Sequence, residues 1–356
     1  MQITKEVKNG VPYIQIADSV CQYSYGYFTH NQWVDEDTLV VGEIFPDNQK
    51  KAHLVNIAEG TSKLLVDHAV SRVVHGRTLY YMDEGELFAM QVDTMETKKI
   101  CRFKTPELGT LHMTNDGRYM SVEVREVVYL VDLETGEIYD EIQKKKFAPP
   151  FSVSDHYKIC PTDKNKVFFA HEGTTTYISN RLWLYERNKG MRCIAKQQLD
   201  ADGNLGDCFG HESWAADGKG LWFVKYRDST VFPKGISYVD LEGNQQNAIY
   251  GKYPYWHVSC SADGRYLAAD AITGDYNGPR FTNHSDEEMA RVYECDCCVV
   301  NLATGEEHSV IKALTNSDHP GHPHPSLSPH AKWMVFHDVV DGRVAACFVK
   351  LEDVGL

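Results

Sequence analysis

The chain repeats one pattern, two short strand-like runs joined by a tight turn, and this repeat constrains the fold more than any other feature. Three copies read GHESWAADGKGLWFVKY from Gly210, WHVSCSADGRYLAADAI from Trp256 and HPHPSLSPHAKWMVFHDV from His322. A weaker copy, LGTLHMTNDGRYMSVEV, begins at Leu108. The turn is Asp-Gly in all copies except the one from His322, which has Pro-His-Ala. Because Asp-Gly between alternating runs is a strong hairpin signal, the repeat predicts a series of antiparallel hairpins.

A second pair of strand-like runs follows each hairpin. In each pair an apolar run ends in Asp-Leu or Asn-Leu, and a turn that contains Gly follows. The three examples are VVYLVDLETGEIYDEI (127–142), ISYVDLEGNQQNAIY (236–250) and CCVVNLATGEEHSVI (297–311). Each unit therefore forms a four-stranded antiparallel sheet. Repeated sheets of this size are the blades of a β-propeller.

Counting from hairpin to hairpin gives seven blades in a single domain that covers residues 1–356. Their approximate limits are 20–66, 67–105, 106–147, 148–199, 200–251, 252–316 and 317–356. The last blade lacks strands, so we expect an early strand, VPYIQIA (11–17), to complete it and close the ring. The segment 271–293 is longer than a blade turn requires and predicts an inserted loop. The predicted fold is all-β, a seven-bladed β-propeller with four-stranded antiparallel blades.

Charge and cysteine content exclude several classes of protein. The formal net charge of −14 argues against general binding of nucleic acid or anionic membranes, which needs a basic face. The ten cysteines lack the spacing of a disulfide or zinc framework, so we interpret them as core thiols in a reducing compartment. The start, MQITKEVKNG, has no apolar signal-peptide core, and no apolar run is long enough for a membrane helix. We therefore expect a cytoplasmic protein.

Histidines occupy one equivalent position in three adjacent blades. His211 and His257 each lie six residues before the turn aspartate, and His324 lies six residues before His330, which replaces that aspartate. The first strand of each blade lines the propeller channel, and side chains alternate between the two faces of a strand. His322, two residues before His324, shares its face. We therefore predict that His211, His257, His322 and His324 meet at one rim of the channel.

A metal site is the function that best explains these aligned histidines. A lone histidine in a β protein is most often a structural residue, but four in register indicate a functional site. Neutral imidazole is the commonest metal ligand. Three histidines with open coordination positions suit a catalytic divalent ion such as Zn²⁺ or Mn²⁺, and ligand type alone does not distinguish the two.

The same segments resemble the oligogalacturonate lyases, a family of seven-bladed propeller polysaccharide lyases. The resemblance rests on FFAHEG (168–173) followed by NRLW (180–183), HESWAADG (211–218), WHVSCSADG (256–264) and HPHPSLSP (322–329). These motifs occur in the family's order and at similar separations, whereas the N-terminal blades match only as generic propeller.

The resemblance implies a metal-dependent lyase that cleaves oligogalacturonate, a fragment formed in pectin degradation. Members of the family bind Mn²⁺ through three histidines and a glutamine. The three histidines correspond to His257, His322 and His324, and this chain has His319 at the position of the glutamine. The family's catalytic base corresponds to His211 and its supporting arginine to Arg181. The expected cofactor is therefore a divalent ion, Mn²⁺ first and Zn²⁺ or another ion as alternatives.

Elementary chemistry agrees with these assignments. β-Elimination from a uronide removes the C5 proton, which is α to a carboxylate, and a metal on that carboxylate neutralises the charge that develops. A neutral histidine with an ordinary pKa near 6.5 can accept the proton near neutral pH. An arginine that pairs with a second carboxylate would fix the sugar.

Four further residues are candidates for substrate binding. His171 and Glu172 end a strand-like run, and they either contact substrate or support the site. Arg280, in the inserted loop, is an alternative carboxylate clamp, and Tyr255 is a candidate platform for a sugar ring. The expected partner is an acidic oligosaccharide bound by a monomer or homodimer.

The competing hypothesis is a non-catalytic propeller that serves as a protein-interaction or ligand-binding scaffold. The chain contains no Trp-Asp dipeptide, the usual signal of WD40 repeats, and this reading leaves the aligned histidines without a role. A propeller attached to a peptidase is disfavoured because no G-x-S-x-G element occurs.

Overall fold

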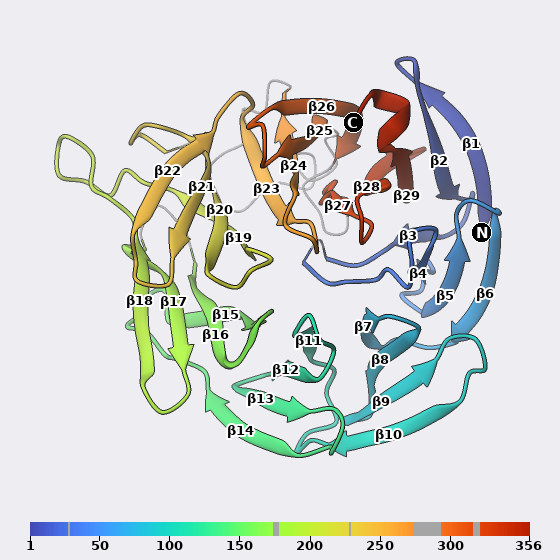
Figure 1. Cartoon of the computed structure of the whole chain (residues 1–356), viewed down its shortest axis with the longest axis horizontal. Coiled ribbons are helices and arrows are strands. Elements are labelled where there is room, and N and C mark those ends of the chain that lie inside the picture. Colours follow the sequence, from blue (N-terminus) through green and yellow to red (C-terminus); the bar gives the residue numbers. More distant parts are fainter. Residues whose placement is uncertain (28, 174–177, 228, 274–292, 316–320) are drawn as a thin grey trace. The chain divides into compact units, whose positions relative to one another are not determined.

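The computed structural model describes residues 1–27, 29–173, 178–227, 229–273, 293–315 and 321–356. These residues form seven antiparallel sheets, six with four strands and one with five, and one short 3-10 helix, η2 (Leu351–Val354) (Figure 1). The sheets are the blades of a seven-bladed β-propeller, which confirms the predicted fold class.

Six sheets each take four strands that are consecutive in the sequence. The first two comprise β3 (Gln22–Ser24), β4 (Thr38–Ile44), β5 (Lys50–Asn56) and β6 (Thr61–Val66), then β7 (Ser71–His75), β8 (Thr78–Asp83), β9 (Glu86–Gln91) and β10 (Thr97–Arg102). The next two comprise β11 (Thr110–Met113), β12 (Tyr119–Val124), β13 (Val127–Asp132) and β14 (Ile138–Gln143), then β15 (Val153–Cys160), β16 (Asp163–Glu172), β17 (Asn180–Glu186) and β18 (Gly190–Lys196). The last two comprise β19 (Phe209–Trp214), β20 (Gly220–Lys225), β21 (Gly235–Asp240) and β22 (Gln245–Tyr250), then β23 (Tyr255–Cys260), β24 (Tyr266–Ile272), β25 (Tyr293–Asn301) and β26 (Glu307–Thr315).

The seventh sheet joins the two ends of the chain. It comprises β1 (Gln2–Lys8), β2 (Val11–Ala17), β29 (Arg343–Lys350), β28 (Trp333–Val340) and β27 (Ser326–Leu327), in that spatial order. Strand β2 pairs with β29, with Ile14 opposite Phe348 and Ile16 opposite Ala346. The predicted closing strand is therefore confirmed, residue for residue. Strand β1, which pairs only with β2 and is largely exposed, is a fifth strand that the sequence reasoning did not include.

The predicted hairpin turns share one backbone geometry. Gly117, Gly218 and Gly264 have φ values of 70°, 68° and 69°, and Ala331 of the Pro-His-Ala turn has a φ of 59°. In each turn this residue's N–H donates to the carbonyl three residues earlier, at 2.9 to 3.0 Å. The left-handed region suits glycine, and alanine adopts it here at some cost in strain. The alignment of the last blade with the Asp-Gly blades is therefore confirmed.

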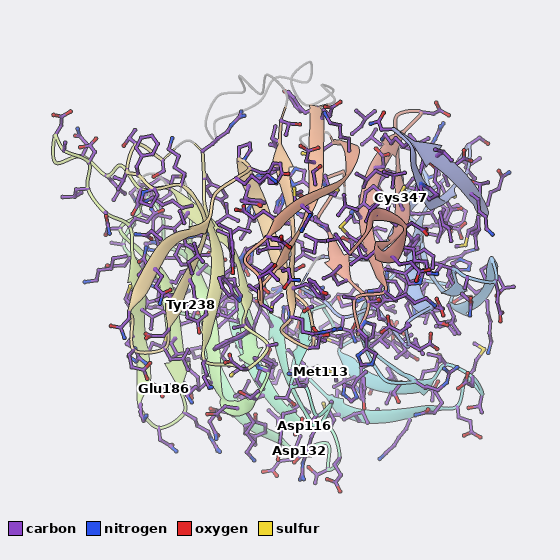
Figure 2. The ribbon with its side chains drawn as sticks, turned by 45° about the horizontal axis from the view of Figure 1, so that its top comes forward. Met113, Asp116, Asp132, Glu186, Tyr238 and Cys347 are labelled. Atoms are coloured by element: carbon purple, nitrogen blue, oxygen red, sulfur yellow. The ribbon has the colours of Figure 1, made fainter. Side chains whose placement is uncertain are left out.

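The turn aspartates also stabilise the hairpins. Figure 2 labels Asp116, in the turn between β11 and β12, and Asp132, the last residue of β13. Arg118 connects them, because its N–H donates to Asp116 Oδ1 at 3.0 Å and its Nη2 lies 3.1 Å from Asp132 Oδ2. The backbone N–H groups of Lys219 and Arg265 donate in the same way to Asp217 and Asp263, each at 3.0 Å, which explains why the same turn sequence marks several blades.

Residue contacts divide the chain into two compact units. The first comprises Met1–Asp83, Phe88–Lys98 and Ser259–Leu356, and the second comprises Glu84–Leu87 and Lys99–Val258. One boundary falls inside β23, whose sheet partners β24, β25 and β26 all belong to the first unit. The expectation of a single domain stays a prediction.

Apolar cores lie between successive sheets within each unit. In the first unit, Trp33 and Phe348 belong to a core shared by β3–β6 and the seventh sheet. In the second unit, Phe168, Trp214 and Phe223 belong to a core shared by β15–β18 and β19–β22. All ten cysteines are free, and seven of them are buried, as expected for core thiols.

Each observed sheet falls within a predicted blade, apart from the strands at the N-terminus. The predicted insertion at 271–293 overlaps β24 and β25 at its ends, and its residues 274–292 lie outside the described residues. Among the described residues, no helix has the length and hydrophobicity to cross a membrane.

Candidate active site

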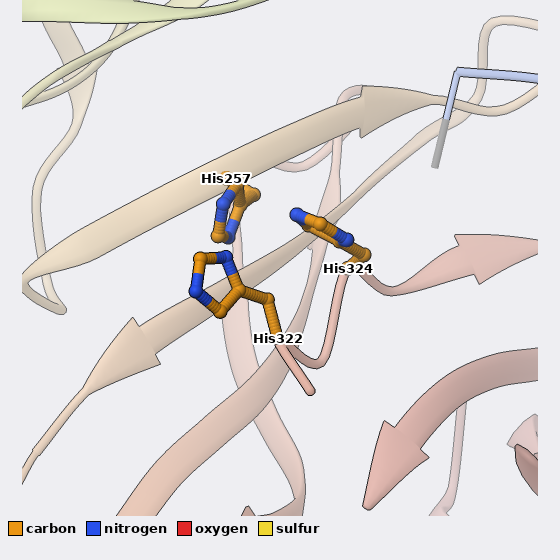
Figure 3. A group of neighbouring side chains, drawn as sticks. All are labelled: His257, His322 and His324. Atoms are coloured by element: carbon orange, nitrogen blue, oxygen red, sulfur yellow. The ribbon is translucent and has the colours of Figure 1, made fainter. Parts of the chain in front are cut away.

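Three buried histidines bring their ring nitrogens close together. One ligand nitrogen from each of His257, His322 and His324 lies within 4.8 Å of the other two, and Figure 3 shows the three rings gathered. Their exposed fractions are 0%, 7% and 1%. His257 lies on β23, and the other two lie in the segment that leads into β27. The sequence prediction brought these three together, and the structure does the same.

Buried side chains fix the backbone that carries two of these histidines. The Asp270 carboxylate accepts the His324 N–H at 3.1 Å, and the Tyr25 hydroxyl donates to the His324 carbonyl. His337 Nδ1 lies 3.1 Å from the His322 carbonyl, and its ring stacks on Tyr25 with 4.5 Å between centroids. His324 itself has a φ of 45°, a conformation that is rare outside glycine and clusters at functional sites.

The three-histidine group fits a divalent cation. Its donors are all imidazole nitrogens, which suit Zn²⁺ and Mn²⁺ among other ions. Nitrogens within 4.8 Å of one another need only small ring rotations to reach one ion, which leaves other coordination positions for a ligand. His319, predicted as a fourth ligand, lies outside the described residues.

His211 lies beside this group but is not one of its three ligands. Its ring centroid is 4.0 Å from that of His257. His211 Nδ1 lies 2.7 Å from the Trp256 carbonyl, which can only accept, so Nδ1 carries the proton and Nε2 the lone pair. The Tyr226 hydroxyl lies 2.8 Å from the same Nδ1. Burial lowers the pKa of His211 to about 3, so the ring is neutral at physiological pH.

A β-bulge positions His211, and an equivalent bulge positions His156 one blade earlier. Between β19 and β20 the register shifts from Gly210 to Ser213, and between β15 and β16 it shifts from Asp155 to Lys158. Each bulge holds a histidine in the left-handed region, with φ values of 53° for His211 and 63° for His156. Strict alternation along the strand, which the sequence reasoning assumed, therefore does not hold at His211, because a bulge re-aims side chains.

A buried cluster of charges surrounds Arg181. Its Nη2 lies 2.8 Å from Glu172 Oε1 and 3.3 Å from Glu212 Oε1, and its Nη1 donates to the His171 carbonyl. The exposed fractions of Arg181 and Glu212 are 3% and 0%. His156 Nδ1 lies 3.6 Å from Glu212 Oε2. Arg181 is thus held on several sides by acceptors.

Electrostatics keeps Glu212 and Arg181 ionised. Burial alone would raise the pKa of Glu212, but Arg181 and His156 outweigh it and hold that pKa well below its usual range. Burial alone would lower the pKa of Arg181, but Glu212 and Glu172 hold it above its usual value. A glycine permits the arrangement, because a Cβ on Gly210 would lie 2.6 Å from the Tyr226 hydroxyl and 2.9 Å from Arg181 Nη2.

The predicted substrate-binding residues occupy different environments. The His171 ring stacks on Phe147, with 3.6 Å between centroids, and its Nε2 lies 2.7 Å from the Phe151 carbonyl. Tyr255 is 2% exposed. Arg280 lies outside the described residues. The roles of these residues and of Glu172 stay predictions.

Several residues of the site were not predicted from the sequence. They are His156, Glu212, Tyr226, Trp256 and Asp270. Trp256 is only partly buried and its ring lies 4.4 Å from that of His257, so it is better exposed to a ligand than Tyr255. Glu212 carried one signal, its place in the His-Glu pair of the most distinctive repeat. The others come together only through folding.

Comparisons with known proteins agree on one family. The family model described as oligogalacturonate lyase matches residues 118–354, a range that includes every site residue named above except Tyr25. An oligogalacturonide lyase of Pectobacterium atrosepticum is 28% identical over 232 residues, and an oligogalacturonate lyase of Dickeya dadantii is 25% identical over 232 residues. Each match covers 63% of this chain and 55% of the relative, so the chain spans about half the length of the curated relatives it matches.

Solved structures show the same fold. An oligogalacturonate lyase in complex with manganese superposes with a TM-score of 0.75 at 20% identity, over 98% of this chain and 96% of that one. An oligogalacturonate lyase from Vibrio parahaemolyticus superposes with a TM-score of 0.74 at 18% identity, over 98% of this chain and 97% of that one.

Proposed function

Because the chain belongs to the oligogalacturonate lyase family, we propose that it cleaves short uronic-acid oligosaccharides, such as oligogalacturonate, by β-elimination. One observation carries the proposal beyond family membership. A buried, neutral histidine, His211, lies with its ring 4.0 Å from His257, one of three histidines that can bind a cation together. A base beside a cation site is the pair of groups that this elimination needs.

The proposed reaction balances as follows. His211 Nε2 accepts the C5 proton, and the C–H electron pair forms a double bond between C4 and C5. The C4–O bond breaks, and the departing oxygen takes up a proton, which leaves a 4,5-unsaturated uronate. Charge develops on the carboxylate attached to C5, and a divalent ion supplies neutralisation there when bound.

His211 is suited to the role of base by its hydrogen bonds. The Trp256 carbonyl keeps the proton on Nδ1, so Nε2 carries the lone pair that can accept the C5 proton. Positioned proton transfer of this kind contributes about 10²–10⁴-fold to a rate.

Arg181 acts as a positioned charge in this proposal. Glu172 and Glu212 hold its guanidinium, and a Cβ on Gly210, the residue before His211, would lie 2.9 Å from its Nη2. Because both carboxylates pair with it, Arg181 would act through its fixed position and not by adding net positive charge.

We further propose Mn²⁺ as the bound ion, held by His257, His322 and His324. The donor set supports a divalent ion, and the related lyase whose structure contains manganese supports Mn²⁺ in particular. Zn²⁺ is the alternative that the same donors accept.

An ultraviolet assay tests the proposal. The protein is supplied with Mn²⁺ or Zn²⁺ and with oligomers of galacturonate and other uronates, and the conjugated unsaturated product is followed by its absorbance. We expect activity that His211→Ala lowers by about 10²–10⁴-fold. His308→Ala, a half-exposed histidine on β26, is the matched control and should retain activity. Absence of cleavage with every oligomer and ion would instead favour the non-catalytic scaffold.

A further inference from the structure

A pocket lies in the first unit, apart from the group formed by His257, His322 and His324. It has a volume of about 340 Å³, near the lower limit of small-ligand sites. Its lining includes parts of β3, β4, β5 and β7. The residues that matter for its chemistry are Ser24, Gly26, Gly42, Lys50, Lys51 and Arg72.

Arg72 is a cation without a charged partner in this pocket. Its Nε donates to Gln32 Oε1 at 3.1 Å and its Nη2 to the Ser24 carbonyl at 3.4 Å, and both acceptors are neutral. Among the described residues, no carboxylate lies within ion-pair distance of it. Burial lowers the pKa of Arg72 to about 10, with no acidic neighbour to oppose the effect. Arg181, by contrast, has two carboxylates against it.

The other charges of the pocket do not neutralise Arg72. Lys50 and Lys51 add positive charge to the lining. Glu43, the lining carboxylate, is engaged elsewhere, because its Oε1 accepts from the Tyr23 hydroxyl and its Oε2 lies 3.0 Å from His53 Nε2. In a chain with a net charge of −14, this pocket is a local cationic site.

The absence of a side chain on Gly42 leaves room for the guanidinium of Arg72. A Cβ on Gly42 would lie 2.9 Å from Arg72 Nη2, so a larger residue there would displace the arginine head group. Gln32 holds the guanidinium from another side and itself donates to the Arg72 carbonyl at 3.2 Å. The guanidinium is therefore pre-positioned, which reduces the entropic cost of binding an anion.

One short segment connects the pocket to the histidine group. Ser24 and Gly26 line the pocket. Tyr25, between them, donates its hydroxyl to the His324 carbonyl, and the Tyr27 ring lies 5.0 Å from the His324 ring in an edge-on contact. This segment therefore contacts both the pocket and His324.

We propose that the Arg72 pocket binds the carboxylate of a third uronate unit, beyond the two units joined by the cleaved bond. The proposal rests on the proposed lyase function and deepens it by assigning a preference for chain length. A guanidinium with two neutral acceptors still presents N–H donors for a carboxylate in a paired geometry. The partly buried charge would then gain the carboxylate partner that the described residues do not supply.

Kinetics on oligomers of defined length test this subsite. We compare kcat/KM for uronide dimers and trimers in the parent, Arg72→Gln, Arg72→Lys and Arg102→Gln, the last being a 71% exposed arginine on β10. We expect Arg72→Gln to lower the trimer-to-dimer ratio of kcat/KM by about 10–100-fold, the loss of a charge-assisted hydrogen-bonded pair. Arg72→Lys should recover part of the ratio, since it retains charge but not the planar fork, and Arg102→Gln should keep all of it.

Binding measurements separate the two proposals. Trimer affinity is measured by calorimetry in His211→Ala, with and without Arg72→Gln, so that turnover does not interfere. A trimer that is cleaved by the parent and binds both proteins equally would overturn the Arg72 subsite and leave the lyase function standing. A parent that neither cleaves nor binds any uronide would overturn both. Arg72→Lys keeps the test decisive if Arg72→Gln does not fold.

Discussion

Replacing Glu212 with glutamine tests whether the buried charge cluster stabilises the fold. Glu212 is 0% exposed, and its Oε1 lies 3.3 Å from Arg181 Nη2. At an effective dielectric constant of about 20, two unit charges at that distance attract by about 5 kcal/mol. Removing one buried charge also returns part of its desolvation cost, and Glu172 remains on Arg181, so we expect a net loss of about 3 kcal/mol in the free energy of unfolding.

Thermal and denaturant unfolding measure this loss. For a chain of 356 residues, about 3 kcal/mol lowers the melting temperature by about 4 °C. Glu126→Gln is the matched control, because Glu126 Oε2 also lies 3.3 Å from a cation, Lys146, but that pair is 66–77% exposed and screened by solvent. If the two variants unfold at the same temperature, the reasoning about the buried cluster is refuted.

The pH dependence of this difference follows from the lowered pKa of Glu212. Burial opposes the shift, but Arg181 and His156 dominate, so the folded state releases this proton more readily than the unfolded state. The stabilisation is then complete above the ordinary value of 4.5 and diminishes as pH falls below it. The parent should approach Glu212→Gln in stability only in acid.

Three further predictions concern other buried groups and the proposed ion. Burial lowers the pKa of Lys158 from 10.5 to about 8, so the unfolded state binds more protons than the folded state between these two pH values. The stability of the parent relative to Lys158→Met should therefore rise by about 3 kcal/mol from pH 8 to pH 10.5 in denaturant titrations. A fall in this relative stability over the same pH range would contradict the prediction. Tyr226→Phe removes the hydroxyl 2.8 Å from His211 Nδ1 and should lower kcat by about 2–10-fold, whereas an unchanged kcat and pH profile would exclude a positioning role. Mn²⁺ at 100 times its Kd should stabilise the parent by about 2.7 kcal/mol, and equal stabilisation of His322→Ala would exclude that residue as a ligand.

The fold was largely predictable because its signals are local. Asp-Gly turns recur at one spacing, and Gly117, Gly218 and Gly264 take the left-handed conformation that such turns require. The alternation in 11–17 was enough to identify the closing strand. Strand β1 was not predictable, because its sequence, QITKEVK, is largely exposed and shows no buried face. It is a strand because its backbone pairs with β2.

The sequence predicts the site residues that lie in register with the repeat. It does not predict those that a bulge or the packing of two blades brings into the site. His257, His322 and His324 could be identified because register and a family motif agree. The bulge at His211 leaves no trace in the alternation pattern, since one extra residue changes the facing of its neighbours without changing composition. His156 and Glu212 lie 56 residues apart in sequence and meet only when two blades pack side by side.

Mn²⁺ titration followed by electron paramagnetic resonance tests the central claim, that imidazoles from neighbouring blades hold one cation. The account predicts one tightly bound Mn²⁺ per chain in the parent and in His211→Ala. It predicts loss of that ion in each of His257→Ala, His322→Ala and His324→Ala, with the fold retained. Unchanged Mn²⁺ binding in all three single variants would contradict it.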